Sequence, residues 1–151
     1  MKLPRATIGC LLLVFVTAIR AETALEVSNP WIREAPPTAR VLAGYMTLLN
    51  HGDTPLILTK VSSPDFESAE FHRTVIEDGM ARMLPLKELE VPANGRVDLE
   101  PGERHLMLIN PARPLHDGDT SLLTIHCADG AVLRVSVPVV RRTGDSGHQH
   151  H

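Results

Sequence analysis

Short runs rich in aliphatic and β-branched residues recur along the chain, and clusters of Gly, Pro, Asn and Asp separate them. No long stretch repeats its apolar residues at the 3.6-residue period of an amphipathic helix. Strand-length runs with regular turn signals are typical of β-sandwiches and Greek-key barrels, so we predict an all-β fold. The predicted strands are Val41–Leu49, Leu56–Ser62, Ser68–Arg73, Ala81–Leu86, Arg96–Leu99, His105–Ile109, Ser121–Cys127 and Ala131–Val140.

Three Asp-Gly pairs stand between such runs, and two of them concern hairpins. Asp129-Gly130 is a strong hairpin signal, because a type I′ turn needs positive φ at both central positions and Gly adopts that conformation freely. We expect this turn to join the last two strands. Asp78-Gly79 separates the runs at 68–73 and 81–86, and a hairpin there would bring those two runs side by side.

The N-terminus reads as a secretory signal covering residues 1–21. Lys2 and Arg5 precede the apolar run from Cys10 to Ile19, and we place cleavage after Ala21. The run is too short for a comfortable membrane span, so we expect an exported protein without a stable membrane span. Lipidation of Cys10 is not favoured, because a polar and Pro-containing segment precedes it.

The remaining chain has the size of one domain, which we expect at residues 22–142, followed by a disordered tail at 143–151. Once the three basic residues of the signal are removed, Asp and Glu outnumber Lys and Arg, which argues against a nucleic-acid partner. Cys127 is then the only cysteine, so the domain has no internal disulfide.

A pattern of His and Met residues predicts a metal site. His105 and Met107 point the same way, because residues i and i+2 of a strand share a face. If Asp78-Gly79 forms a hairpin turn, His72 and Met83 lie on its two arms. They share a face when the residue numbers of paired positions add to an odd sum, and an even sum separates them.

Two imidazoles and two thioethers would suit Cu(I), because soft thioether sulfur prefers this ion and imidazole also binds copper. Zn(II), Ca(II) and Mg(II) would be poorly served by such ligands. Thioethers need no deprotonation, so the site would bind copper without the proton competition that a thiolate meets. We therefore predict one Cu(I) held by His72, Met83, His105 and Met107.

The spacing of these four residues resembles the H-x10-M-x21-H-x-M signature of periplasmic copper chaperones of the PCuAC type. Similar positions extend over about residues 26–140 and include Trp31, Gly44-Tyr45 and Pro101-Gly102. The resemblance implies a cupredoxin-like β-sandwich that binds Cu(I) in the periplasm. It also implies a copper-accepting partner, either subunit II of cytochrome c oxidase during CuA assembly or another copper chaperone, and a role without catalysis.

Other readings of the sequence stay open. The same site would serve an exported copper storage or redox protein, and a metal-free interaction module would place the four residues on different faces. A blue-copper site at His126-Cys127 is not expected, because by analogy with that class a histidine should follow the cysteine closely. The sequence contains no catalytic template of the usual kinds, and we expect a monomer. A second and weaker site for Cu(II) is expected in the tail, at His148, His150 and His151.

Overall fold

The computed structural model describes residues 23–142, and this part of the chain contains ten strands and no helix. It accordingly has no helix that is long and apolar enough to span a membrane. The strands are β1 (Leu25–Arg33), β2 (Val41–Asn50), β3 (Leu56–Ser62), β4 (Phe66–Glu77), β5 (Met80–Leu86), β6 (Leu89–Val91), β7 (Arg96–Leu99), β8 (Arg104–Pro111), β9 (Thr120–Cys127) and β10 (Val132–Val140).

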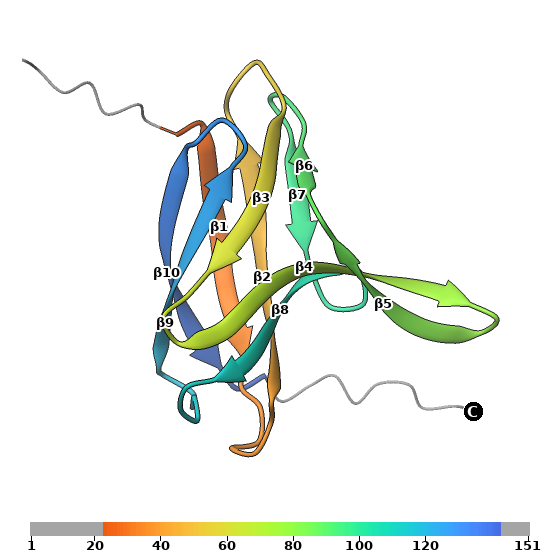
Figure 1. The fold of residues 1–151 in the computed structure, drawn as a ribbon, viewed down its shortest axis with the longest axis vertical. Coiled ribbons are helices and arrows are strands. Elements are labelled where there is room, and N and C mark those ends of the chain that lie inside the picture. Colours follow the sequence, from red (N-terminus) through yellow and green to blue (C-terminus); the bar gives the residue numbers. More distant parts are fainter. Residues whose placement is uncertain (1–22, 143–151) are drawn as a thin grey trace, which may run out of the picture.

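Seven of these strands close into a barrel, in the order β4, β8, β2, β1, β10, β9 and β3 (Figure 1). The pair Val61 and Ala69 closes the ring between β3 and β4. All neighbours are antiparallel except β1 and β10, which run parallel. The remaining strands extend from the ring, with β5 on β4, β6 on β3 and β7 on β2. The predicted all-β architecture is confirmed.

The hydrophobic core fills the inside of this barrel. Alternation along β9 illustrates the arrangement. Leu123 and Ile125 are fully buried, whereas Leu122, directly before Leu123, points outward and is exposed. Burial of one such aliphatic side chain contributes about 1.5–3 kcal/mol. Cys127 continues the same buried row as a free thiol, so the described part of the chain folds without a disulfide.

Strands β4 and β5 form an arm that leaves the barrel (Figure 1). The first part of β4 pairs with β8 as far as Arg73, and its continuation pairs with β5 alone. Asp78 and Gly79 close the arm with φ of 52° and 74°, which is the positive φ that a type I′ turn requires. The predicted strand ended at Arg73 and was too short, because residues 74–77 lie outside the core and carry no burial pattern.

The prediction missed β1 and β6. In β1, Asn29-Pro30 resembles a turn signal, and it is a bulge at which Asn29 has φ of 49° and the register with β2 shifts. Alternation resumes after the bulge, where Ile32 is fully buried. Strand β6 is only three residues long, which is too short for a period to be recognised.

The hairpin between β9 and β10 is confirmed, but the predicted type I′ turn is wrong. Of the pair Asp129-Gly130, only Gly130 has positive φ, at 88°. The Gly130 N–H donates to the Cys127 carbonyl at 3.0 Å. The next residue, Ala131, already bonds across the hairpin, because its carbonyl accepts from the Cys127 N–H. This is a longer loop in which a tight turn ends on a left-handed glycine. Because this loop is one residue longer than the two-residue loop of a type I′ turn, Asp129 does not need positive φ.

Asn50 is a buried polar anchor at the end of β2, with 2% of its surface exposed. Its amide donates to the carbonyls of Thr54 and Val91 at 2.8 and 3.1 Å, and its oxygen accepts from the Gly52 N–H at 2.9 Å.

We expect Asn50→Ala to lower the free energy of unfolding by about 2–4 kcal/mol in chemical denaturation, because each buried group left unsatisfied costs about 1–3 kcal/mol. The exposed neighbour His51 is the control, and an equal loss in His51→Ala would contradict this role.

Glu34 directly follows β1, and its carboxylate accepts hydrogen bonds from Arg141, which directly follows β10. Hydrogen bonds from the Arg141 side chain and from the Asp117 N–H hold the pKa of Glu34 at about 2, below its ordinary 4.5, with smaller contributions from the charges of Arg141 and His116. A depressed folded pKa stabilises the protein above the ordinary pKa, and this stabilisation is lost as the pH falls from 4.5 towards 2. Thermal unfolding of Glu34→Gln should therefore depend less on pH over this window than that of the parent. Parallel curves would contradict the prediction.

Candidate metal centre

The four predicted ligands lie on one face of neighbouring strands. His72 on β4 stands directly opposite His105 on β8, and Met107 follows two residues along β8. Met83 on β5 pairs with Thr74, which is two residues from His72 on β4. The arm therefore has the odd-sum register, which puts Met83 diagonal to His72 on the same face.

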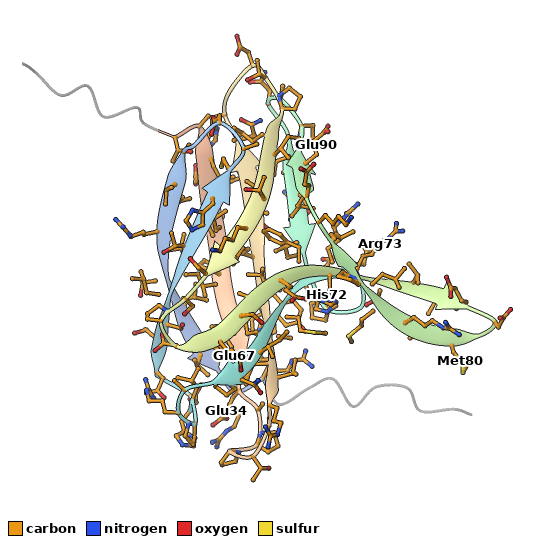
Figure 2. The ribbon with its side chains drawn as sticks, viewed as in Figure 1. Glu34, Glu67, His72, Arg73, Met80 and Glu90 are labelled. Atoms are coloured by element: carbon orange, nitrogen blue, oxygen red, sulfur yellow. The ribbon has the colours of Figure 1, made fainter. Side chains whose placement is uncertain are left out.

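The opposite face of the same strands belongs to the core. Phe71, Leu106 and Leu108 point into the barrel and are almost completely buried. Since side chains alternate, the metal-site face is the outer face of the barrel wall, at the base of the arm. The two histidines are nevertheless buried, with 6% and 5% of their surfaces exposed. Figure 2 shows His72 where the arm leaves the barrel.

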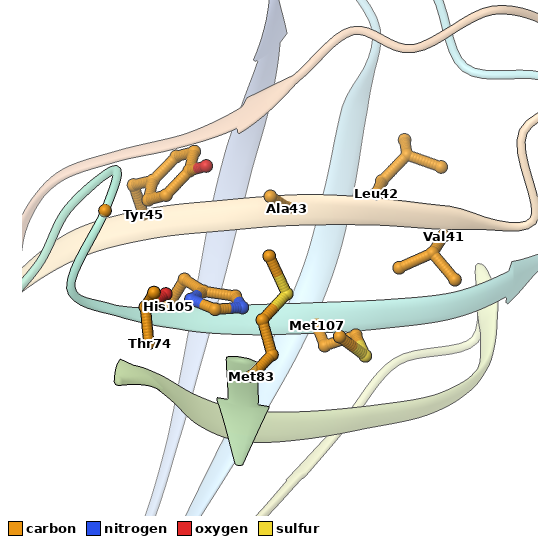
Figure 3. A pocket seen from close by; sticks show the side chains of 9 residues that line it. Val41, Leu42, Ala43, Tyr45, Thr74, Met83, His105 and Met107 are labelled. Atoms are coloured by element: carbon orange, nitrogen blue, oxygen red, sulfur yellow. The ribbon is translucent and has the colours of Figure 1, made fainter. Parts of the chain in front are cut away.

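Both methionines border an open pocket of about 270 Å³ above this face (Figure 3). Met83 is 58% exposed, whereas Met107 is half-buried. His72 is not among the residues that line the pocket, but its ring centroid lies 5.9 Å from that of His105. The lining residues are Val41, Leu42, Ala43, Tyr45, Thr74, Met83, Gly102, His105 and Met107.

Each imidazole has one occupied and one unoccupied ring nitrogen. His72 Nε2 lies 2.9 Å from a Glu70 carboxylate oxygen, and His105 Nδ1 lies 3.3 Å from the Glu103 carbonyl oxygen. The other two nitrogens, His72 Nδ1 and His105 Nε2, are buried without a hydrogen-bond partner among the described residues. An unsatisfied buried acceptor costs about 1–3 kcal/mol, and metal coordination would use such a lone pair.

Burial also favours the neutral form of His105. Desolvation lowers the pKa of His105, the hydrogen bond to the Glu103 carbonyl opposes this shift, and the neighbouring His72 lowers the pKa further. A neutral imidazole is the form that binds a metal ion. The local electrostatics therefore favour a ligand-competent state of this side chain.

Two neighbours of the site were not singled out as functional by the sequence. Glu70 shares the face of His72 by strand alternation, so the i and i+2 rule could have found it. Tyr45 forms one wall of the pocket and packs on Trp31 with ring centroids 4.6 Å apart. The guanidinium of Arg142 lies over the Trp31 ring, 4.1 Å from its centroid.

Other candidate ligands are not part of this centre. No group of three or more His, Cys, Asp and Glu residues gathers to hold a metal in residues 23–142. Cys127 lies on β9, and burial raises the pKa of its thiol. Met80 is as exposed as Met83 but lies on the other face of the arm, where it pairs with Glu77. Figure 2 shows Met80 near the tip of the arm. The signal at 1–21 and the tail at 143–151, with His148, His150 and His151, lie outside the described residues.

Comparisons with known proteins agree with this fold. The family model of LpqE-like putative lipoproteins matches residues 25–139. An uncharacterized protein of Rickettsia prowazekii (strain Madrid E) is 32% identical over 126 residues, with 79% of this chain and 68% of the relative covered. A putative lipoprotein of Leifsonia xyli subsp. xyli is 29% identical over 116 residues, with 76% and 69% covered.

Two solved structures extend the comparison. The copper-bound PCuAC domain from PmoF2 has a TM-score of 0.68 at 22% identity, covering 82% of this chain and 97% of that domain. The Cu(I)-bound DR1885 protein of Deinococcus radiodurans has a TM-score of 0.63 at 34% identity, covering 79% and 81%. The cupredoxin-like fold and the resemblance to the PCuAC type are thereby confirmed. With a family match over almost the whole barrel, the chain belongs to the LpqE-like family of putative lipoproteins and has the fold of a PCuAC domain.

Proposed function

We propose that this protein is a copper chaperone that binds one Cu(I) ion through His72, Met83, His105 and Met107 and releases it to an acceptor. The observation that carries the proposal is the pair of buried imidazole nitrogens without partners, on the face that also presents two thioethers. Buried polar atoms are normally hydrogen-bonded, so two buried lone pairs without partners on facing histidines indicate a place where a ligand binds.

The chemistry of the four side chains favours Cu(I). Two neutral imidazoles and two thioethers form a soft and uncharged donor set, and copper is the biological metal that such donors select. Hard cations would need oxygen donors, and residues 23–142 offer no acidic cluster to supply them. Two proteins of similar structure support this choice, since the PmoF2 domain is copper-bound and DR1885 is known with Cu(I).

The exposure of Met83 supports a transfer role. Direct handover requires the ligands of the acceptor to reach the ion, and burial of both methionines would have argued against it. Met83 is 58% exposed and borders an open pocket, so an incoming ligand can replace it first. Among residues 23–142 the only cysteine is Cys127, which lies on β9 outside this site. A site without a thiolate fits carriage of Cu(I) better than the His and Cys ligands of a blue-copper electron carrier would.

The finer parts of the proposal rest on the resemblance. We expect export to the periplasm by the signal at 1–21, action as a monomer, and delivery to cytochrome oxidase subunit II for CuA assembly or to another copper chaperone. The putative lipoprotein name of the Leifsonia relative also fits an exported protein. The tail histidines His148, His150 and His151 are proposed as a weaker Cu(II) site.

The other two functions are separated by simple observations. A storage or redox protein would bind several ions per chain or cycle reversibly between Cu(I) and Cu(II). A metal-free interaction module is not favoured, because its four residues should lie on different faces and here they share one.

We expect His72→Ala and Met107→Leu to lower Cu(I) affinity by about tenfold or more each, because one lost ligand worth about 1.4 kcal/mol or more changes an equilibrium constant by that factor. The measurement is an anaerobic Cu(I) titration against a chromophoric competitor, with one ion bound per parent chain. Met80→Leu is the matched control, since Met80 lies on the opposite face of the arm. Unchanged affinity in both ligand variants would refute the site.

Met83→Leu should accelerate copper release to a chelating acceptor by about tenfold in stopped-flow measurements, because loss of a 1.4 kcal/mol contact raises the dissociation rate by that factor. Met80 and Met83 have the same exposure on the same strand, so Met80→Leu controls for changes in the arm itself. Equal release rates in the two variants would contradict a ligand role for Met83.

A further inference from the structure

We infer that Glu70 is a positioning residue that fixes the tautomer of His72, so that the two histidines present different ring nitrogens to the metal. His72 presents Nδ1, whereas His105 presents Nε2. The two tautomers are a property of the metal-free protein. The effect of Glu70 on copper binding rests on the function proposed above.

The contact of Glu70 with His72 defines the position of the ring proton. Both residues lie on the outer face of β4, two positions apart, and Nε2 approaches the carboxylate oxygen at 2.9 Å. An ionised carboxylate can only accept a hydrogen bond, so His72 Nε2 must carry the proton and donate it. The lone pair of a neutral His72 is therefore on Nδ1, which is the buried nitrogen without a partner.

The contact of His105 with the backbone produces the opposite tautomer. Its Nδ1 approaches the Glu103 carbonyl oxygen at 3.3 Å, and a carbonyl oxygen likewise only accepts. His105 Nδ1 must therefore carry the proton, which leaves the lone pair on Nε2, the second buried nitrogen without a partner. Different hydrogen-bond partners set the two tautomers, and in both rings the unprotonated nitrogen is the one without a hydrogen-bond partner.

Glu70 also places a negative charge beside an uncharged ligand set. Its side chain is 48% exposed, while the side chain of His72 is only 8% exposed, so the carboxylate remains hydrated and the imidazole does not. In the register of β4 with β8, Glu70 stands opposite Met107, on the same face as the proposed ligands. A carboxylate that accepts from a ligating imidazole fixes the ring and raises its basicity. It would also compensate the single positive charge of bound Cu(I).

Long-range ¹H–¹⁵N NMR of the ¹⁵N-histidine-labelled full chain tests the inference directly, because it distinguishes the two tautomers of a neutral imidazole. In the metal-free parent, above the ordinary titration range of histidine, we expect the Nε2–H form for His72 and the Nδ1–H form for His105. Glu70→Ala should give His72 a mixture of tautomers, and Glu70→Gln should favour the Nε2–H form less strongly than the parent does, because its amide either accepts from Nε2–H or donates to an unprotonated Nε2. A parent with His72 in the Nδ1–H form would overturn the inference.

Cu(I) competition titration of the same variants tests the consequence for the metal. Glu70→Ala should lower the affinity by about 10- to 100-fold, as is typical when the hydrogen-bond partner of a metal-bound histidine is removed, and Glu70→Gln should recover part of the loss. Glu77→Ala is the matched control, because Glu77 is a similarly exposed carboxylate on the other face of β4. An unchanged affinity in Glu70→Ala would overturn the positioning role. A parent that binds no Cu(I) would instead refute the proposed function, and the metal-free spectra would still decide the tautomers.

Discussion

The antiparallel register of β4 with β8 is the constraint on which the proposed metal centre depends. It places His72 opposite His105 on the outer face, and it places Phe71 opposite Leu106 in the core. A slip by one residue would exchange the faces, burying polar imidazoles in the barrel and exposing core side chains. The hydrophobic effect therefore fixes the spacing of the two histidines, although neither contributes apolar surface to the core. A site built on such strands is held more rigidly than one built on loops.

The arm adds the one proposed ligand that the barrel does not hold. Strand β5 is an edge strand that pairs with β4 alone, and most of its side chains are exposed. Elements with few buried contacts open locally at lower free energy than core strands. Under the proposed function, Met83 would therefore leave the ion while His72, His105 and Met107 keep their places in the barrel wall. Exchange with an acceptor would use this division between three fixed ligands and one replaceable ligand.

Much of the centre was predictable because it depends on strand alternation. His105 and Met107 share a face from spacing alone, and the parity of the β4–β5 hairpin follows once its turn is known. The pairing of β4 with β8 joins segments more than thirty residues apart, and no local signal reports it. The same limit explains the missed β1, whose Asn29-Pro30 bulge interrupts alternation. The role of Glu70 depends on a hydrogen bond that a spacing can permit but cannot identify.

X-ray absorption spectroscopy of the Cu(I)-loaded chain at the copper edge tests the central claim most directly, because it reports the donor atoms themselves. The account predicts one ion per chain with two nitrogen and two sulfur neighbours, and the loss of one sulfur neighbour in Met107→Leu but of none in Met80→Leu. A shell of nitrogen and oxygen without sulfur, or the same sulfur count in the parent and Met107→Leu, would contradict it.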